Sequence, residues 1–542
     1  MLKKINFNIM TLMTVIMLTV TFFACGDDVN VYDGPVIEVI SGPETIIYIV
    51  GEPFDPTGIE LITYDDEGNT EPIALNDPDL KFEYDFSKPG TDKIVTIKYK
   101  GKVFKTIAVK VYADEGDGTA AKPFLTRNPE ALQYVGRGTA NPEGYKTWTL
   151  SAHYAQTTNI TLPAVAAGES NWTPSSSTFT VKYDGNGRTI TGLTISSTSS
   201  YQGLFGVIGT GGEVKNLSLK GCDIKGGSYV GGIAGQLYGT IQNCNVEGDV
   251  SGATNVGGVV GTNRGTIQDC SAAGNVRSSS NGVGGVAGYN YGTLRGSYST
   301  CNVGVLGGYS SIGGVAGSNE ALIEYCYATG NVEGKNYVGG VVGESKGATN
   351  IVQFCYATGD VKGESYTGGV MGNNESGGIV QNCYATGNIE GTSYTGGVMG
   401  TNGTNGASIL QNCYATGNIN CTGSRIGGVV GENWSDKTTQ NCVALNKIVA
   451  TSSIITDQMI GRVAGLNYTT GVVINCYGLS DMSIISSLYS IPGTDVTPAQ
   501  ALTQSWWTGT AKWSTSIWNI SNGKLPTLKN MPGNPTQDPQ LK

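Results

Sequence analysis

One repeated phrase along residues 203–478 constrains the fold more than any other feature of the chain. It opens with two glycines and a β-branched residue, and about ten residues on comes a phrase such as Gln-Asn-Cys-Tyr-Ala-Thr-Gly-Asn. The glycine phrase opens at Gly231, Gly257, Gly284, Gly313, Gly339, Gly368, Gly396 and Gly427, with weaker copies at Gly203 and Gly461. From Gly231 onward the openings are 26, 27, 29, 26, 29, 28, 31 and 34 residues apart. Such regular self-similarity indicates a repeat architecture.

The residue composition of each repeat predicts short β-strands joined by tight glycine turns. The apolar runs are rich in β-branched residues and are too short for helices, and a period near 28 residues leaves room for two or three strands. If one repeat forms one coil, equivalent positions stack at roughly 4.8 Å, the spacing of neighbouring strands. We therefore predict an all-β fold built mainly as a parallel β-helix. A β-propeller is the alternative, although its blades usually need about 40 residues.

Eight of the twelve cysteines occupy one slot of the repeat. They are Cys244, Cys270, Cys326, Cys355, Cys383, Cys413, Cys442 and Cys476. Stacked coils keep their Cβ vectors parallel, which suits a disulfide poorly, so we predict a buried ladder of reduced cysteines. Some disulfides or a metal site are the alternatives. Outside the ladder, Cys421 is expected to be exposed.

Tyrosine follows the ladder cysteine in most repeats, including Tyr327, Tyr356, Tyr384 and Tyr414. Adjacent strand residues face opposite sides, so an inward cysteine predicts an outward tyrosine stripe. Exposed aromatic rows stack on sugar rings or on a partner surface, which makes these four residues candidate ligand contacts. The alternative is that the rings only stack on each other. A second set precedes the glycine phrase at Tyr229, Tyr337, Tyr366 and Tyr394.

Candidates for catalysis and metal binding are weak. Glycosidases need two carboxylates within about 10 Å, and Glu333, Asp360, Glu364 and Glu390 show no distinctive pair, so solvated turns explain them better. The single histidine, His153, excludes an HExxH zinc site. The Asp-Gly-Asn-Gly phrase at 184–187 is more typical of a turn than of a calcium loop. We predict no catalytic residues, metal or cofactor.

The net charge of −10 argues against nucleic acid as a partner, because phosphates require basic patches. The N-terminus instead points to a membrane. Residues 1–24 read as a secretory signal peptide, with two lysines before an apolar stretch. Phe-Phe-Ala-Cys at 22–25 resembles a bacterial lipobox, which implies lipidation of Cys25 and a lipid anchor. The alternative is an ordinary signal peptide with an incidental cysteine.

The following Gly-Asp-Asp at 26–28 resembles the surface-export signal of Bacteroidetes lipoproteins. This resemblance implies an outer-membrane protein displayed at the cell surface, with residues 25–33 as its tether. Residues 34–113 carry alternating strand patterns and a Lys100-Gly101 hairpin turn, which predicts one small β-sandwich. The phrase at 49–59 resembles the opening of bacterial Ig-like domains, which usually serve as stalks.

The rest of the chain divides into segments that differ in residue composition. We predict a flexible linker over 114–122, an opening region of the β-helix over 123–200 with a helix starting at Asn128-Pro129, and the repeat β-helix over 201–490. Residues 491–529 contain four tryptophans and are predicted to cap the open end of the solenoid. Residues 530–542 are predicted to be disordered.

The repeats resemble the GLUG motif of bacterial surface proteins, including the region that precedes the catalytic part of IgA1-type proteases. The resemblance covers about half of the chain and implies a β-helix. We interpret the chain as a non-enzymatic surface adhesin or recognition module that binds a host or dietary glycan, or another surface protein. The alternatives are a β-helix carbohydrate-active enzyme and a structural envelope component.

Overall fold

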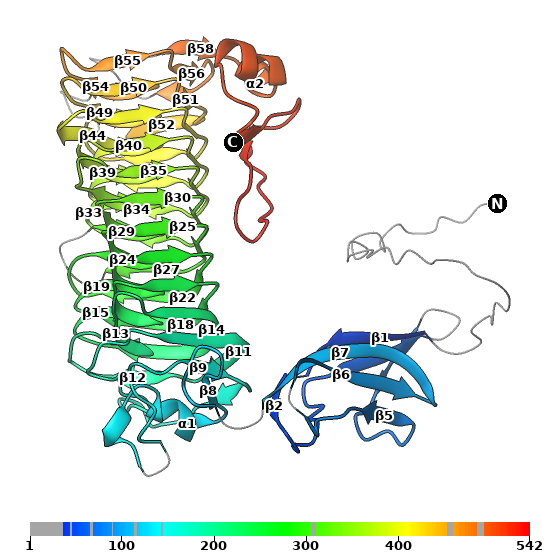
Figure 1. The fold of residues 1–542 in the computed structure, drawn as a ribbon. Helices are drawn as coiled ribbons and strands as arrows, with labels where there is room; N and C mark the ends of the chain where they lie inside the picture. Colours follow the sequence, from blue (N-terminus) through cyan, green and yellow to red (C-terminus); the bar gives the residue numbers. More distant parts are fainter. Residues whose placement is uncertain are drawn as a thin grey trace, which may run out of the picture.

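The computed structural model describes residues 36–43, 46–64, 69–88, 90–112, 116–142, 145–305, 307, 311–451, 459–484, 491 and 493–542. Over these residues the chain is nearly all-β, with a small N-terminal β domain followed by a parallel solenoid of about 11 turns (Figure 1). The predicted fold class is therefore confirmed. The signal peptide, the tether and Cys25 lie outside the described residues. Within the described part, no helix has the length and apolarity needed to cross a membrane.

The solenoid wall consists of three parallel sheets of 32, ten and nine strands. One coil shows how the repeat folds. It contains β33 (Asn336–Gly339), β34 (Val342–Ser345), β35 (Ile351–Gln353), β36 (Tyr356–Ala357) and β37 (Val361–Lys362). The expected two or three strands are thus five, because each apolar run is split into pieces of two to four residues by a bend of the wall.

Equivalent residues of neighbouring coils lie in register, so the sequence period becomes the coil period. Tyr327 pairs with Tyr356, and Tyr356 pairs with Tyr384. The β-branched residue of the glycine phrase, as at Val341, is fully buried in the core. The second glycine is required by backbone contact between coils, because a Cβ on Gly340 would lie 2.1 Å from the carbonyl oxygen of Gly369.

The cysteine ladder is confirmed as a reduced and buried column. Each thiol is aimed at backbone carbonyls, and Cys355 Sγ donates to the carbonyl of Gln353 at 3.1 Å. The expectation that Cys421 is exposed was wrong, since it is 1% exposed. It ends β47 (Ile419–Cys421) within the wall and pairs with Gly391 of the previous coil and Thr451 of the next.

The N-terminal domain has two sheets around its own core. One sheet contains β1 (Val36–Ser41), β3 (Glu60–Tyr64) and β4 (Thr70–Ile73). The other contains β2 (Ile47–Ile49), β7 (Lys102–Tyr112), β6 (Gly90–Tyr99) and β5 (Leu80–Glu83). Lys100 and Gly101 adopt φ of 50° and 78° and form the predicted hairpin turn between β6 and β7.

Helix α1 (Pro129–Tyr134) starts at the predicted cap, where Asn128 Oδ1 accepts a bond from the Ala131 N–H at 2.8 Å. Part of the predicted flexible linker is instead a packed turn. The N–H groups of Asp117 and Gly118 donate to the Lys122 carbonyl, and Gly118 lies against Phe124. Residues 113–115 lie outside the described residues.

The C-terminal region departs most from expectation. After β58 (Thr494–Val496) and α2 (Pro498–Ala501), the chain forms a π-helix (Trp506–Thr510) and a two-stranded sheet of β59 (Trp518–Asn519) and β60 (Thr527–Leu528). The segment then descends beside the solenoid (Figure 1). The four tryptophans pack against tyrosines of the side wall, in addition to any role as an end cap.

Residues 530–542 are not the disordered tail that the sequence analysis predicted. Gln537 accepts a hydrogen bond from Tyr384, and Lys542 donates to Asn388 Oδ1 at 2.7 Å. Leu541 packs against the main core as a partly buried side chain. The composition of this segment is polar and proline-rich, but its contacts are with distant residues of the solenoid, which no local pattern encodes.

Candidate functional site

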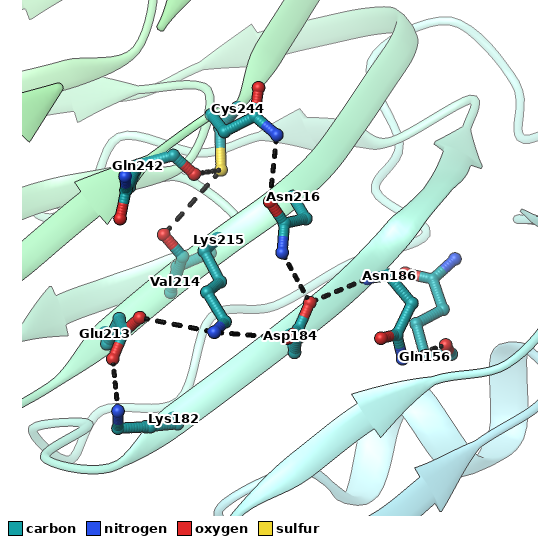
Figure 2. Close-up of polar contacts among 11 residues, drawn as sticks. Gln156, Lys182, Asp184, Asn186, Glu213, Val214, Lys215, Asn216, Gln242 and Cys244 are labelled. Atoms are coloured by element: carbon teal, nitrogen blue, oxygen red, sulfur yellow. Dashed lines mark hydrogen bonds and ion pairs between the residues drawn. The ribbon is translucent and has the colours of Figure 1, made fainter. Parts of the chain in front are cut away.

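The first coils are joined by a polar network around Asp184, shown in Figure 2. The carboxylate accepts hydrogen bonds from the Asn216 side chain at 3.0 Å and from the Asn186 N–H at 2.9 Å, and Lys215 Nζ lies 3.4 Å away. Residues 184–187 form a bulge within β11 (Lys182–Thr191), so the phrase is neither a calcium loop nor the separate turn that the sequence predicted. Among the described residues, no group of three or more His, Cys, Asp or Glu is placed to hold a metal ion.

Three of the four carboxylates considered for acid–base chemistry, Glu333, Asp360 and Glu390, line a shallow trough of ≈ 470 Å³, and Glu364 lies in a neighbouring pocket. Glu333 pairs with Lys362 at 3.2 Å, and Asp360 Oδ1 accepts the Asn388 N–H at 2.7 Å. The register places Lys362 between Glu333 and Glu390 on successive coils. This arrangement resembles a charge-paired surface more than a pair of carboxylates facing one bond.

The predicted tyrosine stripe exists as a stacked column, which we call the sealed ladder: Tyr298, Tyr327, Tyr356, Tyr384 and Tyr414. Successive ring centroids lie 4.8, 4.9, 4.8 and 5.0 Å apart, with planes within 6° of parallel. The column is not exposed, which corrects the expectation. Tyr327, Tyr356, Tyr384 and Tyr414 are 6%, 2%, 1% and 0% exposed.

The C-terminal region covers this column from outside the coil. Tyr414 packs against Trp507, Trp513 and Trp518 and donates to the Pro526 carbonyl at 2.7 Å. Gln537 accepts from the Tyr384 hydroxyl at 3.0 Å. Burial raises the pKa of Tyr327 to about 12 and raises the pKa of Tyr414 further. The outward direction was predicted correctly, but a segment more than one hundred residues away covers the rings.

The second tyrosine set forms a row that remains half-exposed, which we call the open row: Tyr337, Tyr366 and Tyr394. Their rings stack at 4.9 and 4.5 Å on successive coils. In Figure 1, β33, which carries Tyr337, lies on the side of the solenoid away from the C-terminal segment. Because the rings stack face to face, the row leaves their edges partly open to solvent.

The backbone of the open row is strained. Tyr337, Tyr366 and Tyr394 have φ of 53°, 56° and 55°, in the left-handed region that favours glycine and asparagine. Such conformations cost on the order of 1–3 kcal/mol each and occur preferentially at functional sites. The same slot is also left-handed at Tyr229, Asn255, Gly282 and Arg425, so the conformation belongs to the turn of the repeat.

Charged and aromatic groups lie at the two ends of the open row. At one end Arg425 lies over the Tyr394 ring at 4.6 Å, and its Nε is 3.4 Å from Glu432. Trp434 Nε1 and the Tyr468 hydroxyl also donate to Glu432. Burial raises the pKa of the Glu432 carboxyl, while Arg425 and these donors oppose the shift.

At the other end, the buried Glu344 accepts from Ser311 Oγ at 2.9 Å and pairs with Lys346 at 3.0 Å. On the strands between Glu344 and Glu432 stand the neutral side chains of Asn373 and Thr401. Both carboxylates are charge-paired, so the row is an aromatic and polar strip without a strong net field.

The sequence identified the open row as a set but did not rank it above the sealed ladder. The glutamates, Arg425 and Trp434 were missed. Glu344 and Glu432 share one slot of the repeat, but the slot varies from coil to coil, so periodicity did not select these residues. A column-by-column comparison of the repeats would have shown the change from Tyr394 to Arg425 at the same slot.

Comparison with known proteins identifies two modules. Residues 42–111 match the bacterial Ig-like domain (group 3) family. The GLUG motif matches at 226–251, 252–277 and 308–333. Both are modules of structural or surface type.

Two curated relatives match about a quarter of the chain. A "putative Gly-rich membrane protein" of Evansella cellulosilytica is 36% identical over 140 residues, which are 24% of this chain and 15% of the relative. Halomucin of Haloquadratum walsbyi is 31% identical over 145 residues, 24% of this chain and 2% of the relative. The chain thus corresponds to a small part of each relative's own length.

One solved structure, described as a "putative immunoglobulin A1 protease" from Bacteroides ovatus, is 15% identical. The match covers 76% of this chain and 94% of that chain, but its TM-score is 0.23, so it carries no argument here. The sequence matches of the two modules agree with the observed N-terminal sheets and coils. The chain carries a bacterial Ig-like domain followed by a β-solenoid with GLUG repeats.

Proposed function

We propose that the protein is a cell-surface recognition protein, an adhesin whose open row binds glycan. This proposal rests on the stack of Tyr337, Tyr366 and Tyr394, which lie half-exposed on successive coils in a left-handed backbone conformation. The partly open edges of the stacked rings offer apolar contact to sugar rings, and the hydroxyl groups supply polar contacts. A coil spacing of about 4.8 Å arranges these edges as a continuous strip for an extended chain.

The flanking groups support the same ligand class. Asn373 and Thr401, on the strands between the two paired carboxylates, are neutral and buried, so no unpaired charge lies beneath the row. Arg425 and Lys346 are already paired with Glu432 and Glu344, so an anionic ligand gains less from them. We propose a glycan over another surface protein because a narrow strip suits a linear polymer.

The test is retention on a glycan array. We expect the native chain to bind a set of extended glycans, and Tyr366→Ala with Tyr394→Ala to lose this binding. Tyr238→Ala is the matched control, because Tyr238 is an exposed tyrosine of the same solenoid, 43% exposed, outside the row. Binding that survives the double substitution, or binding only to a surface protein, would reject the proposal.

We also propose that the protein is a binding protein without catalytic activity. The carboxylates of the trough are engaged by Lys362 and by backbone N–H groups, which supports this view. The purified chain should leave every polysaccharide that it binds at its original length. Size-exclusion chromatography of the polysaccharide after incubation would detect any depolymerisation, and shortening would contradict the proposal.

For its location, we propose an outer-membrane lipoprotein anchored through Cys25 and displayed at the cell surface. The support is the lipobox-like sequence at 22–25 and the acidic phrase that follows it. Palmitate labelling in the producing cells should be lost on Cys25→Ser. Labelling that persists in this variant would reject the anchor without affecting the glycan proposal.

A further inference from the structure

The sealed ladder is a surface built like the open row but occupied by the chain itself. Its cover has two parts that differ in packing. The tryptophan cluster (Trp506, Trp507, Trp513 and Trp518) is 0–6% exposed and covers Tyr414. The C-terminal tail (residues 530–542) covers the ladder toward Tyr298 and is mostly exposed or half-exposed.

The tail is held by a small number of side chains: Lys542 bonds to Asn388, Met531 and Leu541 pack against the core, and Gln537 and Gly533 contact the ladder. Gln537 Oε1 accepts from the Tyr384 hydroxyl at 3.0 Å, and Gln537 also bridges both backbone groups of Leu528. Gly533 lies against the rings of Tyr298 and Tyr327. A surface pocket of ≈ 510 Å³, lined by Leu528, Met531, Gln537 and neighbouring residues, opens between the tail and β60.

Tyrosine exposure follows the strength of this cover. It rises from 0% at Tyr414, under the tryptophan cluster, to 6% at Tyr327, and Tyr298 at the far end is half-buried. If the tail lifts, the tryptophan cluster stays in place, and Tyr298, Tyr327, Tyr356 and Tyr384 become an open aromatic groove. The part that can be displaced is therefore the tail and not the whole C-terminal region.

We propose that the sealed ladder is a binding groove for an extended, proline-bearing peptide segment of a partner protein, with the tail as its resident competitor. The chemistry of the occupant comes from the tail itself. After a turn at Gly533 and Asn534 it has no helix or strand, contains Pro535 and Pro539, and presents the Gln537 amide to a tyrosine hydroxyl. Aromatic grooves recognise proline-rich segments because these are already extended and lose little entropy on binding.

A second copy of the chain is a weaker candidate for the occupant. A tethered segment acts at an effective concentration on the order of millimolar, so an identical tail from another molecule cannot displace it at ordinary concentrations. A partner segment that makes the same contacts more tightly can. The groove therefore fits a different protein whose segment resembles the tail but binds better.

The experiment uses the full chain and a labelled peptide of residues 530–542. In one variant the tail is replaced by a Gly-Ser sequence of equal length, which removes the competitor and keeps the tryptophan cluster. By fluorescence anisotropy we expect this variant to bind the peptide at least ~10-fold more tightly than the native chain does. Equal binding by both chains, or none by the variant, would overturn the proposal.

Two further substitutions locate the binding. In the Gly-Ser variant, Tyr327→Ala with Tyr356→Ala should abolish peptide binding, whereas Tyr366→Ala in the open row should leave it unchanged. The reverse is expected for glycan, so failure of this proposal is distinguishable from failure of the proposed function. Peptide binding that depends on Tyr366, or a scrambled peptide that binds equally well, would also overturn it.

If circular dichroism shows that the Gly-Ser variant does not fold, the proposal is tested with Gln537→Ala in the otherwise native chain. This substitution weakens the tail at one contact and should raise the affinity for the native peptide, and no gain would reject the proposal. Glycan retention by the Gly-Ser chain that is lost on Tyr356→Ala would mean a sugar groove instead. Self-association of the native chain through its tail, seen by light scattering, would show that the groove binds a second copy of the chain and would reject the proposal.

Discussion

The sealed ladder and the open row contain the same residue at the same coil spacing but differ in what lies over them. Their rings stack at 4.8–5.0 Å and 4.5–4.9 Å, respectively. The ladder tyrosines from Tyr327 to Tyr414 are at most 6% exposed, whereas the row is half-exposed. Stacking is therefore a property of the coil period, and accessibility is a property of the tertiary cover.

The backbones of the two columns differ as well. Tyr356 and Tyr384 begin short β-strands in the wall, while Tyr366 and Tyr394 adopt left-handed conformations. A strained residue persists only where the surrounding structure compensates it. The ladder thus contributes to stability through burial, whereas the row lies in a left-handed turn that the repeat also forms at Asn255 and Arg425.

Loss of the tryptophan cover over the sealed ladder should have the largest effect on the free energy of unfolding. Trp507 is fully buried against Tyr414 and Trp513. Trp507→Ala should lower the free energy of unfolding by about 3–5 kcal/mol, because it leaves a large cavity. Urea denaturation measures this, with Trp434→Ala beside the open row as control. A loss no greater than that of the control would show that the ladder does not depend on its cover.

Removal of one hydroxyl group should affect the stability of the two columns differently. Tyr414→Phe removes a buried hydrogen bond to the Pro526 carbonyl and leaves that carbonyl without this donor. We expect a loss of about 1–2 kcal/mol in the free energy of unfolding. Tyr366→Phe in the half-exposed row should change it by less than about 0.5 kcal/mol. Equal losses in the two denaturation curves would contradict the difference in burial.

Both columns contain tyrosines whose pKa is raised by burial, and alkaline pH tests this shared property. Burial raises the pKa of Tyr327 and of Tyr366 to about 12, above the value near 10 of an unfolded tyrosine. Because the folded pKa is raised, the stabilisation is complete below pH 10 and is lost as the pH rises from 10 to 12. Denaturation at pH 9 and pH 11 should show this loss, and Tyr327→Phe or Tyr366→Phe should reduce it. An unchanged loss in both variants would contradict the assignment.

The smallest effect concerns the end of the open row. Burial raises the pKa of Glu432, so its contribution to stability is present at low pH and is lost as the pH rises through the folded pKa. Glu432→Gln should flatten this dependence above pH 4.5 by about 1 kcal/mol or less. Stability measured from pH 4 to pH 7 tests this, with the exposed Glu320→Gln as control. A steeper dependence in Glu432→Gln would contradict it.

The sequence by itself determined the features that depend on neighbouring coils. The period near 28 residues predicted the solenoid, the buried β-branched column and the reduced cysteine ladder, since each residue packs against its own equivalent one repeat away. The hairpin at Lys100 and the start of α1 were also predictable, because turn and cap chemistry are local.

Only the tertiary structure decided which tyrosine column is open. Tyr384 meets Gln537 and Tyr414 meets Pro526 across 153 and 112 residues of chain. The C-terminal region is not part of the repeat, so periodicity carries no information about where it packs. Its position depends on the burial of four tryptophans and one ring column against each other, which exists only once the whole wall has formed.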